Sequence, residues 1–493
     1  MNRRDFMRLT GLGGTGLMLP ASLTHALAGE TTTPDWHLGF QNPRAEELHT
    51  PALKLDGRLP QGLAGTFYRN GPARHELGDR RYSHWFDGDG MVHAYRFGDG
   101  CISHHARFVE TPKYRAETCA EAFRRPAFGT VFPDVESVAS PDAINTANTN
   151  ILPFDDRLLA LWEGGSAWEV NPETLATGER LAWSDELEGA PFSAHPAVDT
   201  DGTLWNFGVV PGDGALVLYE IASSGALRRA EVVSLDASPM VHDFAITRRH
   251  LVFLLPPFRL DPERFGRGES FIDSHRWYAD EPMRVLLIDK SDWSRRRWFD
   301  LPAGLHFHIG NAWEDGAGVI RFDYTRYDNA DFVTKAARGL MRGEDVPYAG
   351  GHTALVRLDT RKGRIDQDIL PEETEFPRVD PRRTGERYRQ LYTTVRTRAA
   401  GHPLSNGVMR RDIDSGETEH YDFGANVITE EHVFVPGEAG EDGGWLVGTA
   451  LDVDRQVSLI SVFRADALVD GPVAQAHLPY PVPLGFHGNW KEA

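Results

Sequence analysis

Short, mainly apolar runs bounded by turn-forming residues recur along the whole chain, as in Leu251-Val-Phe-Leu-Leu255 and Arg284-Val-Leu-Leu-Ile288. Each run is long enough for one strand and too short for a typical helix. The 49 glycines and 31 prolines are spread among these runs, where they favour tight turns between strands. The pattern predicts an all-β protein made of many short strands.

One of these patterns repeats with a histidine at its start. His195, His242 and His308 are each followed by a short stretch, a turn and a strand whose centre lies about ten residues further on. A fourth copy begins at Thr149, which stands where the others have histidine. Hairpins that recur at irregular intervals of roughly 45 to 65 residues are typical of propeller blades, so we expect one β-propeller domain.

The histidines of this repeat are candidate metal ligands. In a propeller the inner strands converge on the axis, so side chains at their starts would point at a common centre. A single histidine at a strand entry is more simply an ordinary structural residue, but three in the same position indicate a site. Imidazole binds several transition metals, and the absence of cysteine argues against a closed structural zinc site. Iron, zinc and copper remain open from the residues alone.

Charge and cysteine content exclude some classes of protein. The net charge of -20, from 52 basic and 72 acidic side chains, would repel a phosphate backbone, so nucleic acid is not an expected partner. Only Cys101 and Cys119 are present, too few for a thiolate metal cluster. A single bridge between them and two free thiols are both compatible with the sequence.

The first 28 residues are typical of a twin-arginine (Tat) signal peptide. Arg3-Arg4 precedes a glycine-rich apolar run, Leu9 to Leu27, which ends at an Ala26-Leu27-Ala28 cleavage site. Glycines, Pro20 and His25 interrupt the run and make it weak as a permanent membrane span, although an uncleaved anchor is the alternative. We therefore expect export by the Tat translocase, a periplasmic protein and one propeller domain over residues 29–493.

Several segments, in the same order, resemble the carotenoid cleavage oxygenase family, and the resemblance runs from about Pro43 to the C-terminus. The matching segments are Gly65-Thr-Phe-Tyr-Arg-Asn-Gly-Pro72, Trp85-Phe-Asp-Gly-Asp-Gly-Met-Val-His93, Ala160-Leu-Trp-Glu-Gly-Gly165, Phe307-His-Ile-Gly-Asn-Ala-Trp-Glu314 and Val482-Pro-Leu-Gly-Phe-His-Gly488. The resemblance implies a seven-bladed β-propeller with one non-haem iron on its axis and loops that form a dome over one face.

The resemblance also implies the ligands of that iron. They would be His195, His242, His308 and His487, with no carboxylate bound directly to Fe(II) and two positions left for oxygen or water. His487 lies outside the repeat, so its assignment depends on the resemblance alone. His306 competes with His308, but the Phe-His context favours His308.

Three glutamates are implied to accept the second N–H of ligand histidines, namely Glu163, Glu375 and Glu431. Glu430 is an adjacent competitor for the role of Glu431. Thr149 matches a family position beside a vacant iron site, where its methyl group would restrict what binds. The alternative is a threonine that simply packs in its strand.

The implied activity is Fe(II)-dependent cleavage by O₂ of a conjugated C=C bond, giving two carbonyl products. The expected substrate is an apolar carotenoid or apocarotenoid, and the alternative is a phenolic stilbene or phenylpropene, which the family binds with tyrosine and lysine. Phe108 stands in the segment Ala106–Val109 where such a tyrosine is sought, and it favours the polyene. A periplasmic location instead favours lignin fragments.

Functions of another class also remain open: the propeller would act as an isomerase or as a metal-free binding module. An apolar polyene substrate also raises the question of peripheral membrane contact. The segment from Phe123 to Phe132 is a candidate for an inserted apolar loop.

Overall fold

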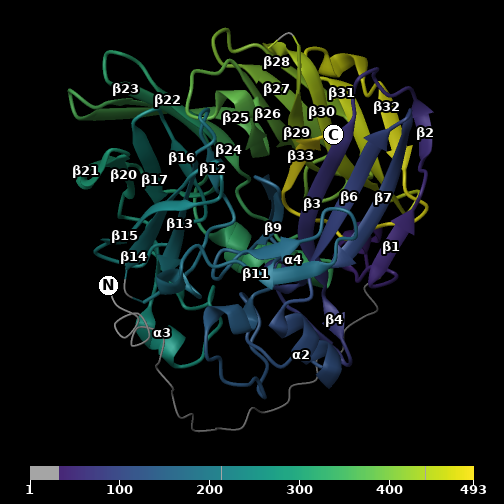
Figure 1. Cartoon of the computed structure of the whole chain (residues 1–493), viewed down its shortest axis with the longest axis horizontal. Coiled ribbons are helices and arrows are strands. Elements are labelled where there is room, and N and C mark those ends of the chain that lie inside the picture. Colours follow the sequence, from purple (N-terminus) through teal and green to yellow (C-terminus); the bar gives the residue numbers. More distant parts are fainter. Residues whose placement is uncertain (1–32, 213, 439) are drawn as a thin grey trace.

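The computed structural model describes residues 33–493 apart from 213 and 439. The predicted Tat signal and the start of the expected domain at residue 29 therefore lie outside the described residues. Strands dominate the rest of the chain and form sheets arranged around a ring (Figure 1). The two apolar runs noted in the sequence are strands β17(His250–Leu255) and β20(Met283–Asp289), which confirms the prediction of many short strands.

The sheets make seven blades in the described part of the chain. Five blades are separate sheets, and a seven-stranded sheet contains two more that share the long strand β25(Arg364–Arg378). The first blade comprises β33(Gly488–Glu492), β3(Gly65–Arg74), β6(Asp89–Gly98), β7(Cys101–Phe108) and β1(Glu47–Thr50). The second comprises β8(Asn150–Phe154), β9(Arg157–Leu161), β10(Trp168–Val170) and β11(Thr177–Arg180). The third comprises β12(Ala197–Val198), β13(Leu204–Val210), β14(Ala215–Ile221) and β15(Leu227–Ser234).

The other four blades continue around the ring in chain order. The fourth comprises β16(Phe244–Ile246), β17, β20 and β21(Asp292–Leu301). The fifth comprises β22(Leu305–Glu314), β23(Val319–Tyr327), β24(His352–Asp359) and the first part of β25, and the sixth comprises the end of β25, β26(Gln390–Val395), β27(Gly407–Asp412) and β28(Thr418–Asp422). The seventh comprises β29(Val427–Gly437), β30(Gly440–Asp452), β31(Val457–Arg464), β32(Ala474–His477) and β2(Lys54–Gly57). The predicted seven-bladed propeller is confirmed.

Both ends of the described chain close the ring. Strand β2 pairs with β32 in the seventh blade, and the C-terminal strand β33 pairs with β3 in the first. Each of these blades therefore combines strands from opposite ends of the sequence. This pairing covers edges that would otherwise be open to other chains.

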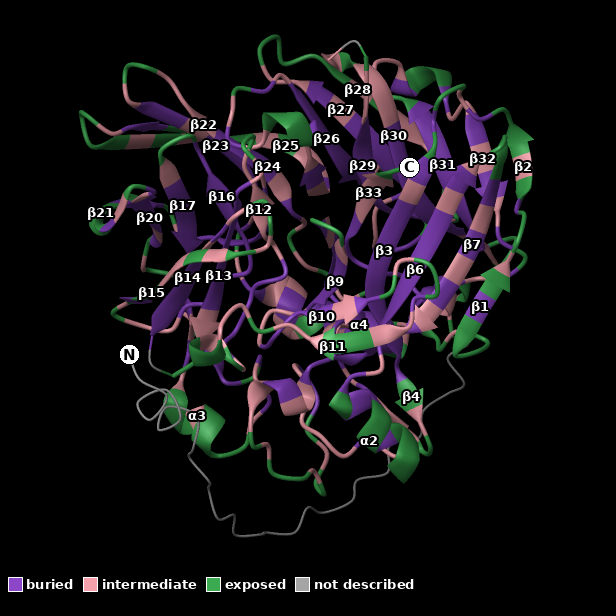
Figure 2. Cartoon of the chain, viewed as in Figure 1, coloured by how far each residue is buried: buried purple, intermediate pink, exposed green. Residues whose placement is uncertain are grey.

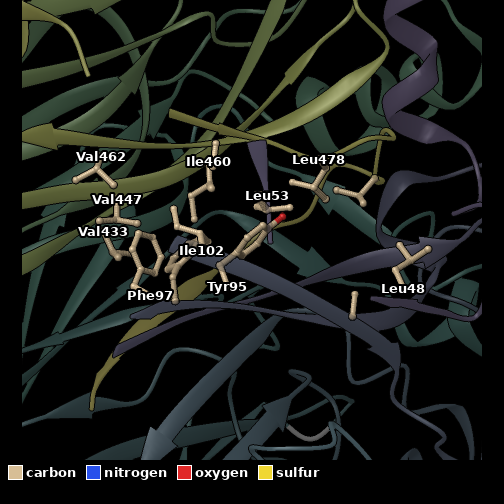
Figure 3. Close-up of a cluster of buried hydrophobic side chains, with 14 of the residues drawn as sticks. Leu48, Leu53, Tyr95, Phe97, Ile102, Val433, Val447, Ile460, Val462 and Leu478 are labelled. Carbon is tan, nitrogen blue, oxygen red and sulfur yellow. The ribbon is translucent and has the colours of Figure 1, made fainter. Parts of the chain in front are cut away.

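The core lies between neighbouring blades. Between the first and seventh blades, Phe97 and Ile102 contact a cluster that includes Val447 and Val462, all at most 4% exposed (Figure 3). Burying a side chain of this size stabilises the fold by about 1.5–3 kcal/mol. Inner strands such as β3 are mostly buried, whereas the outer strands β1 and β2 are largely exposed (Figure 2).

Long connections between strands carry most of the helices and cover one side of the ring. Figure 1 places several of them together at its lower edge, including α2(Pro112–Ala120), α3(Pro262–Gly266) and β4(Glu76–Leu77). The remaining short elements are η1(Asp35–Phe40), β5(Arg80–Arg81), η2(Trp85–Asp87), η3(Pro141–Ile144), η4(Asp185–Leu187), β18(Phe258–Leu260), β19(His275–Trp277), a π-helical turn η5(Phe332–Ala336), α4(Ala337–Arg342), η6(Pro381–Arg383) and η7(Leu468–Asp470). None of the described helices is long and apolar enough to cross a membrane.

The structure decides two expectations from the sequence: a free apolar loop from Phe123 to Phe132, and a bridge between Cys101 and Cys119. Phe123 is fully buried and stacks on Tyr82, with 3.8 Å between ring centroids, so the segment to Phe132 is not a free apolar loop. The rings of Phe123 and Phe132 both pack against Tyr82 and against each other. Cys101 and Cys119 are exposed and unpaired, so the alternative of a bridge between them is wrong.

Candidate metal centre

Four histidines from different blades meet at one point on the inner strands. His195 and His242 each lie two residues before a strand, β12 and β16, His308 lies within β22, and His487 directly precedes β33. One ring nitrogen from each lies within 4.8 Å of the other three. Ligands with bonds of about 2.1 Å are ~4.2 Å apart across an ion and ~3.0 Å apart at right angles. His195 Nε2 and His242 Nε2 are 2.9 Å apart, so the spacing fits a shared metal ion.

The strand predicted about ten residues after each histidine is the second strand of its blade. It is β13 after His195, β17 after His242 and β23 after His308. The histidine itself stands at or near the innermost strand, next to the axis. The repeat in the sequence therefore corresponds to equivalent places in successive blades.

A glutamate lies behind three of the four rings. His308 Nδ1 is 2.5 Å from Glu375 Oε2, and His487 Nδ1 is 2.9 Å from Glu431 Oε1. His242 Nδ1 contacts the Glu163 carboxylate. A ring that donates Nδ1–H to a carboxylate keeps the lone pair of Nε2 free for a metal.

The carboxylates of Glu431 and Glu375 are held in the ionised state. Burial alone would raise the pKa of Glu431, but Arg378, whose Nε is 2.8 Å from Oε1, and His487 hold it well below its usual value. The backbone N–H of Gly488 also donates to Glu431 Oε2 at 2.7 Å. For Glu375, burial is likewise outweighed by His308, so its pKa is lowered. Ionised acceptors increase the basicity of the rings they face.

The structure separates Glu431 from its competitor Glu430. Both residues lie where the register of β29 against β30 shifts, between Thr429 and His432. Glu430 forms an ion pair with Arg69, buried to 1% exposure, and accepts a hydrogen bond from Gly485 N at 2.8 Å. Glu431 alone faces His487.

His306 and His308 are also separated, although residues two apart normally share a face of a strand. The register of β22 against β23 shifts between His306 and Ile309, which turns the two side chains apart. The His306 ring lies edge-on to Tyr324 at 6.2 Å, and burial lowers its pKa to about 3. Only His308 belongs to the four-histidine cluster.

His195 differs from the other three. Among the described residues no glutamate forms a hydrogen bond or ion pair with its ring. The carboxylate that faces it is that of Asp243, whose Oδ1 is 4.0 Å from His195 Nδ1. Asparagine amides fix the loop that carries it: Asn206 Nδ2 donates to Ser193 O at 2.9 Å, and Asn150 Nδ2 donates to Ala194 O at 2.8 Å. Burial, together with the neighbouring histidines, holds the pKa of His195 well below its usual value.

Phe376 is a site residue that the sequence did not reveal. Its φ of 53° lies in the left-handed region, which costs about 1–3 kcal/mol for a bulky residue. Its ring stacks on His308 with 5.0 Å between centroids, and lies 5.4 Å from that of His487. The conformation lets both Glu375 and Phe376 face the histidines from one strand. A residue that precedes proline is expected to be extended, so no local signal predicted this.

An aromatic cavity of about 1180 Å³, counted with its open mouth, adjoins the histidines. His242, His308 and His487 line it, as does Thr149, whose hydroxyl donates to Asn148 Oδ1 at 3.1 Å. No lysine or arginine is among the described residues that line it. The aromatic lining consists of Trp85, Phe86, Phe128, Trp162, Phe307, Tyr327, Phe332, Tyr348, Phe376 and Phe486.

Phe108 does not line this cavity. It is 4% exposed in the core between the first and seventh blades, where it stacks on Tyr114 at 5.3 Å. Phe108 therefore gives no indication of the substrate, because this face of β7 points into the core rather than into the cavity.

Together these features define a β-propeller with a buried four-histidine centre at the end of an aromatic cavity. The family model described as "RPE65: Retinal pigment epithelial membrane protein" matches residues 41–492. The apocarotenoid-15,15'-oxygenase of Synechocystis sp. is 30% identical, covering 93% of this chain and 96% of that protein. The lignostilbene-alpha,beta-dioxygenase isozyme III of Sphingomonas paucimobilis is 28% identical, covering 90% and 94%. The chain belongs to the family of RPE65 and the carotenoid cleavage oxygenases.

Solved structures agree with this assignment. The crystal structure of cobalt-substituted ACO from Synechocystis superposes with a TM-score of 0.83 at 29% identity, covering 93% of this chain and 98% of that one. The resemblance seen in the sequence is thereby confirmed for fold and family.

Proposed function

We propose that the protein is a non-haem iron dioxygenase that cleaves a conjugated C=C bond of a carotenoid or apocarotenoid into two carbonyl fragments. The observation that carries this proposal is the convergence of four histidines, three with an ionised or contacting glutamate behind them, at the end of an aromatic cavity. The enzymes among its relatives, including apocarotenoid and carotenoid oxygenases, support it.

The residues fit an iron ion. His195, His242, His308 and His487 would hold it, and four imidazoles leave two positions of an octahedron open. When bound, Fe(II) would supply the activation of O₂ that the cleavage requires. Three of the four ligands line the cavity and His195 does not, which supports open positions that face the substrate.

The protein's own task is to orient one double bond and exclude water. The aromatic walls provide an apolar surface, and their faces attract positive charge that develops on an alkene. We also propose that Thr149 restricts one vacant position, because it lines the cavity while its backbone carbonyl accepts the N–H of His487 at 3.3 Å. Its hydroxyl is already engaged by Asn148.

The charges around the cavity favour an apolar polyene over a phenolate. The ionisable lining residues are glutamates, histidines and two tyrosines, of which Tyr327 already donates its hydroxyl to Glu375 Oε1 at 3.0 Å. Lys113 is buried elsewhere, between Asp89 and Glu117. A substrate that must ionise would meet negative carboxylates with no lysine to stabilise it.

The second candidate is cleavage of a phenolic stilbene. Tyr348 lines the cavity and offers a phenol group, and relatives include a lignostilbene dioxygenase and a resveratrol cleavage oxygenase of Aspergillus fumigatus. An isomerase remains the alternative that uses the same cavity without O₂.

We further propose export by the Tat translocase to the periplasm, with residues 29–493 as one domain. The twin arginines and the cleavage site of the first 28 residues support this proposal. Peripheral membrane contact would help to deliver an apolar substrate. Phe265 on α3, 48% exposed, is an apolar side chain available for it.

The test is to incubate Fe(II)-loaded protein with apocarotenals and hydroxystilbenes under ¹⁸O₂ and to identify the products by mass spectrometry. We expect two labelled carbonyl fragments from an apocarotenal, with matching O₂ uptake. Cleavage of stilbenes alone would support the second candidate. Conversion without O₂ uptake would contradict the dioxygenase and support the isomerase.

A further inference from the structure

The carboxylates behind the four histidines are not equivalent. Glu163, Glu375 and Glu431 contact their rings directly, whereas His195 has Asp243 at 4.0 Å. The ring of His195 therefore lacks the direct partner that fixes the orientation of the other three.

The Asp243 carboxylate is buried, with 6% of the residue exposed, and its orientation is fixed by two backbone groups. Its Oδ1 accepts the N–H of Phe244 at 2.7 Å, and its Oδ2 accepts the N–H of Ile309 at 2.7 Å. Asp243 therefore follows one ligand, His242, in sequence and is hydrogen-bonded to the residue after another, His308. A group held in this way cannot turn away from His195.

The 4.0 Å between His195 Nδ1 and Asp243 Oδ1 is too long for a direct hydrogen bond. It matches the separation of two groups that share one water molecule, each at about 2.8 Å and at roughly a right angle. We propose that Asp243 is the positioning residue of His195, and that its Oδ1 accepts the Nδ1–H of that ring through one bridging water.

This inference rests on the proposed metal site and adds a fourth carboxylate to it. Asp243 would then connect three ligands: His242 through the chain, His308 through Ile309, and His195 through the water.

A double-mutant cycle separates this role from a merely structural one. Asp243→Asn keeps the size of the side chain, and we expect it to lower Co(II) affinity about 10- to 100-fold in competition with a chelator. In a His195→Ala background the same change should alter affinity less than about 2-fold, because its target is gone. An equal loss of Co(II) affinity in both backgrounds would overturn the proposal. The role of Asp243 would then be only to accept the backbone N–H of Ile309.

Glu375→Gln is the matched control, since Glu375 acts on His308 rather than His195. Its effect on Co(II) affinity should persist in the His195→Ala background. A wild-type protein that binds neither iron nor cobalt would contradict the proposed function. A wild-type protein that binds cobalt no more tightly than the folded Asp243→Asn variant would contradict only the present inference.

A measurement on the wild type needs no variant. In Zn(II)-loaded protein with ¹⁵N-labelled histidine, the Nδ1–H of His195 should show an NOE to one bound water. The absence of this NOE would overturn the proposal. In Asp243→Asn we expect the NOE to be lost, while the Nδ1–H signal of His308 is unchanged.

Discussion

Two groups of buried histidines in this propeller have opposite surroundings. In the first blade His93 Nδ1 lies 3.1 Å from His104 Nε2, and His104 Nδ1 lies 3.2 Å from the hydroxyl of Tyr480. Burial lowers the pKa of His104 to about 3 and holds that of His93 well below its usual value, so this pair is neutral.

At the metal centre burial acts on His308 in the same way, but Glu375 more than offsets it and raises the pKa of the ring. The difference is the set of carboxylates behind the rings. At His487 burial outweighs Glu431 and lowers the pKa to about 4. Burial alone makes a neutral hydrogen-bonded pair, whereas burial with carboxylates behind the rings orients them so that their free nitrogens converge. Four predictions test this contrast.

The largest effect is expected from removing a ring of the metal centre. His308→Ala should abolish cleavage and strongly weaken iron binding, because three imidazoles and an empty position replace the four-histidine set. His104→Ala, from the other group, should keep one iron per chain in its folded fraction. Iron content by elemental analysis and O₂ uptake check both. Normal turnover by His308→Ala would contradict the site.

A smaller effect is expected from neutralising a carboxylate behind a ring. Glu431→Gln should lower iron affinity about 10- to 100-fold, because His487 loses its ionised acceptor. Glu430→Gln is the matched control on the same strand. It should leave metal affinity unchanged but cost about 3–5 kcal/mol of stability, because Arg69 is left buried without its partner. Chelator competition measures the metal affinity of both variants, and denaturant unfolding measures their stability. Loss of metal affinity in Glu430→Gln but not in Glu431→Gln would contradict the role given to Glu431.

The neutral pair should destabilise the protein in acid. The folded pKa of His104 lies below its unfolded value of 6.5, so only the unfolded state gains a proton between about pH 6.5 and 3. Stability is fully present above pH 6.5 and falls below it, by up to about 1.4 kcal/mol per pH unit for one group. His104→Gln should flatten this dependence in urea titrations of the metal-free protein. If the slope of unfolding free energy against pH is the same in His104→Gln, His104 is not the cause of the acid destabilisation.

The smallest effect is expected at Phe376. Phe376 has a left-handed backbone conformation, which glycine adopts without strain. Phe376→Gly should therefore be about 1 kcal/mol more stable than Phe376→Ala. In helices and strands alanine is normally the more stabilising of the two residues. Both variants should retain iron, since the ring stacks on His308 without binding metal. Denaturant unfolding gives the free energy of unfolding of each variant. If Phe376→Ala is as stable as Phe376→Gly, the left-handed conformation at this position is not strained.

Much of the fold could be predicted from local pattern. The strands β17 and β20 follow from apolar runs, and the repeat after His195, His242 and His308 indicates equivalent places in successive blades. Ring closure could not be predicted in this way, because the pairing of β2 with β32 joins opposite ends of the chain.

The geometry of the candidate site could be predicted less completely than the strands, because it depends on tertiary packing. The shift in β22 that separates His306 from His308 is a tertiary feature, and so is the positive φ of Phe376. The position of Phe108 has the same cause: alternation along β7 gives its face, but only the packing of two blades shows that this face meets the core. Asp243 has no motif of its own and is found only by distance to His195.

The most direct test of the four-histidine centre is the anomalous difference density of Fe(II)-reconstituted crystals, measured on both sides of the iron absorption edge. The account predicts one iron peak per chain, within bonding distance of a nitrogen from each of His195, His242, His308 and His487, with no carboxylate oxygen bound directly. A peak elsewhere, a glutamate oxygen bound to the metal, or no iron at all after anaerobic reconstitution would contradict it.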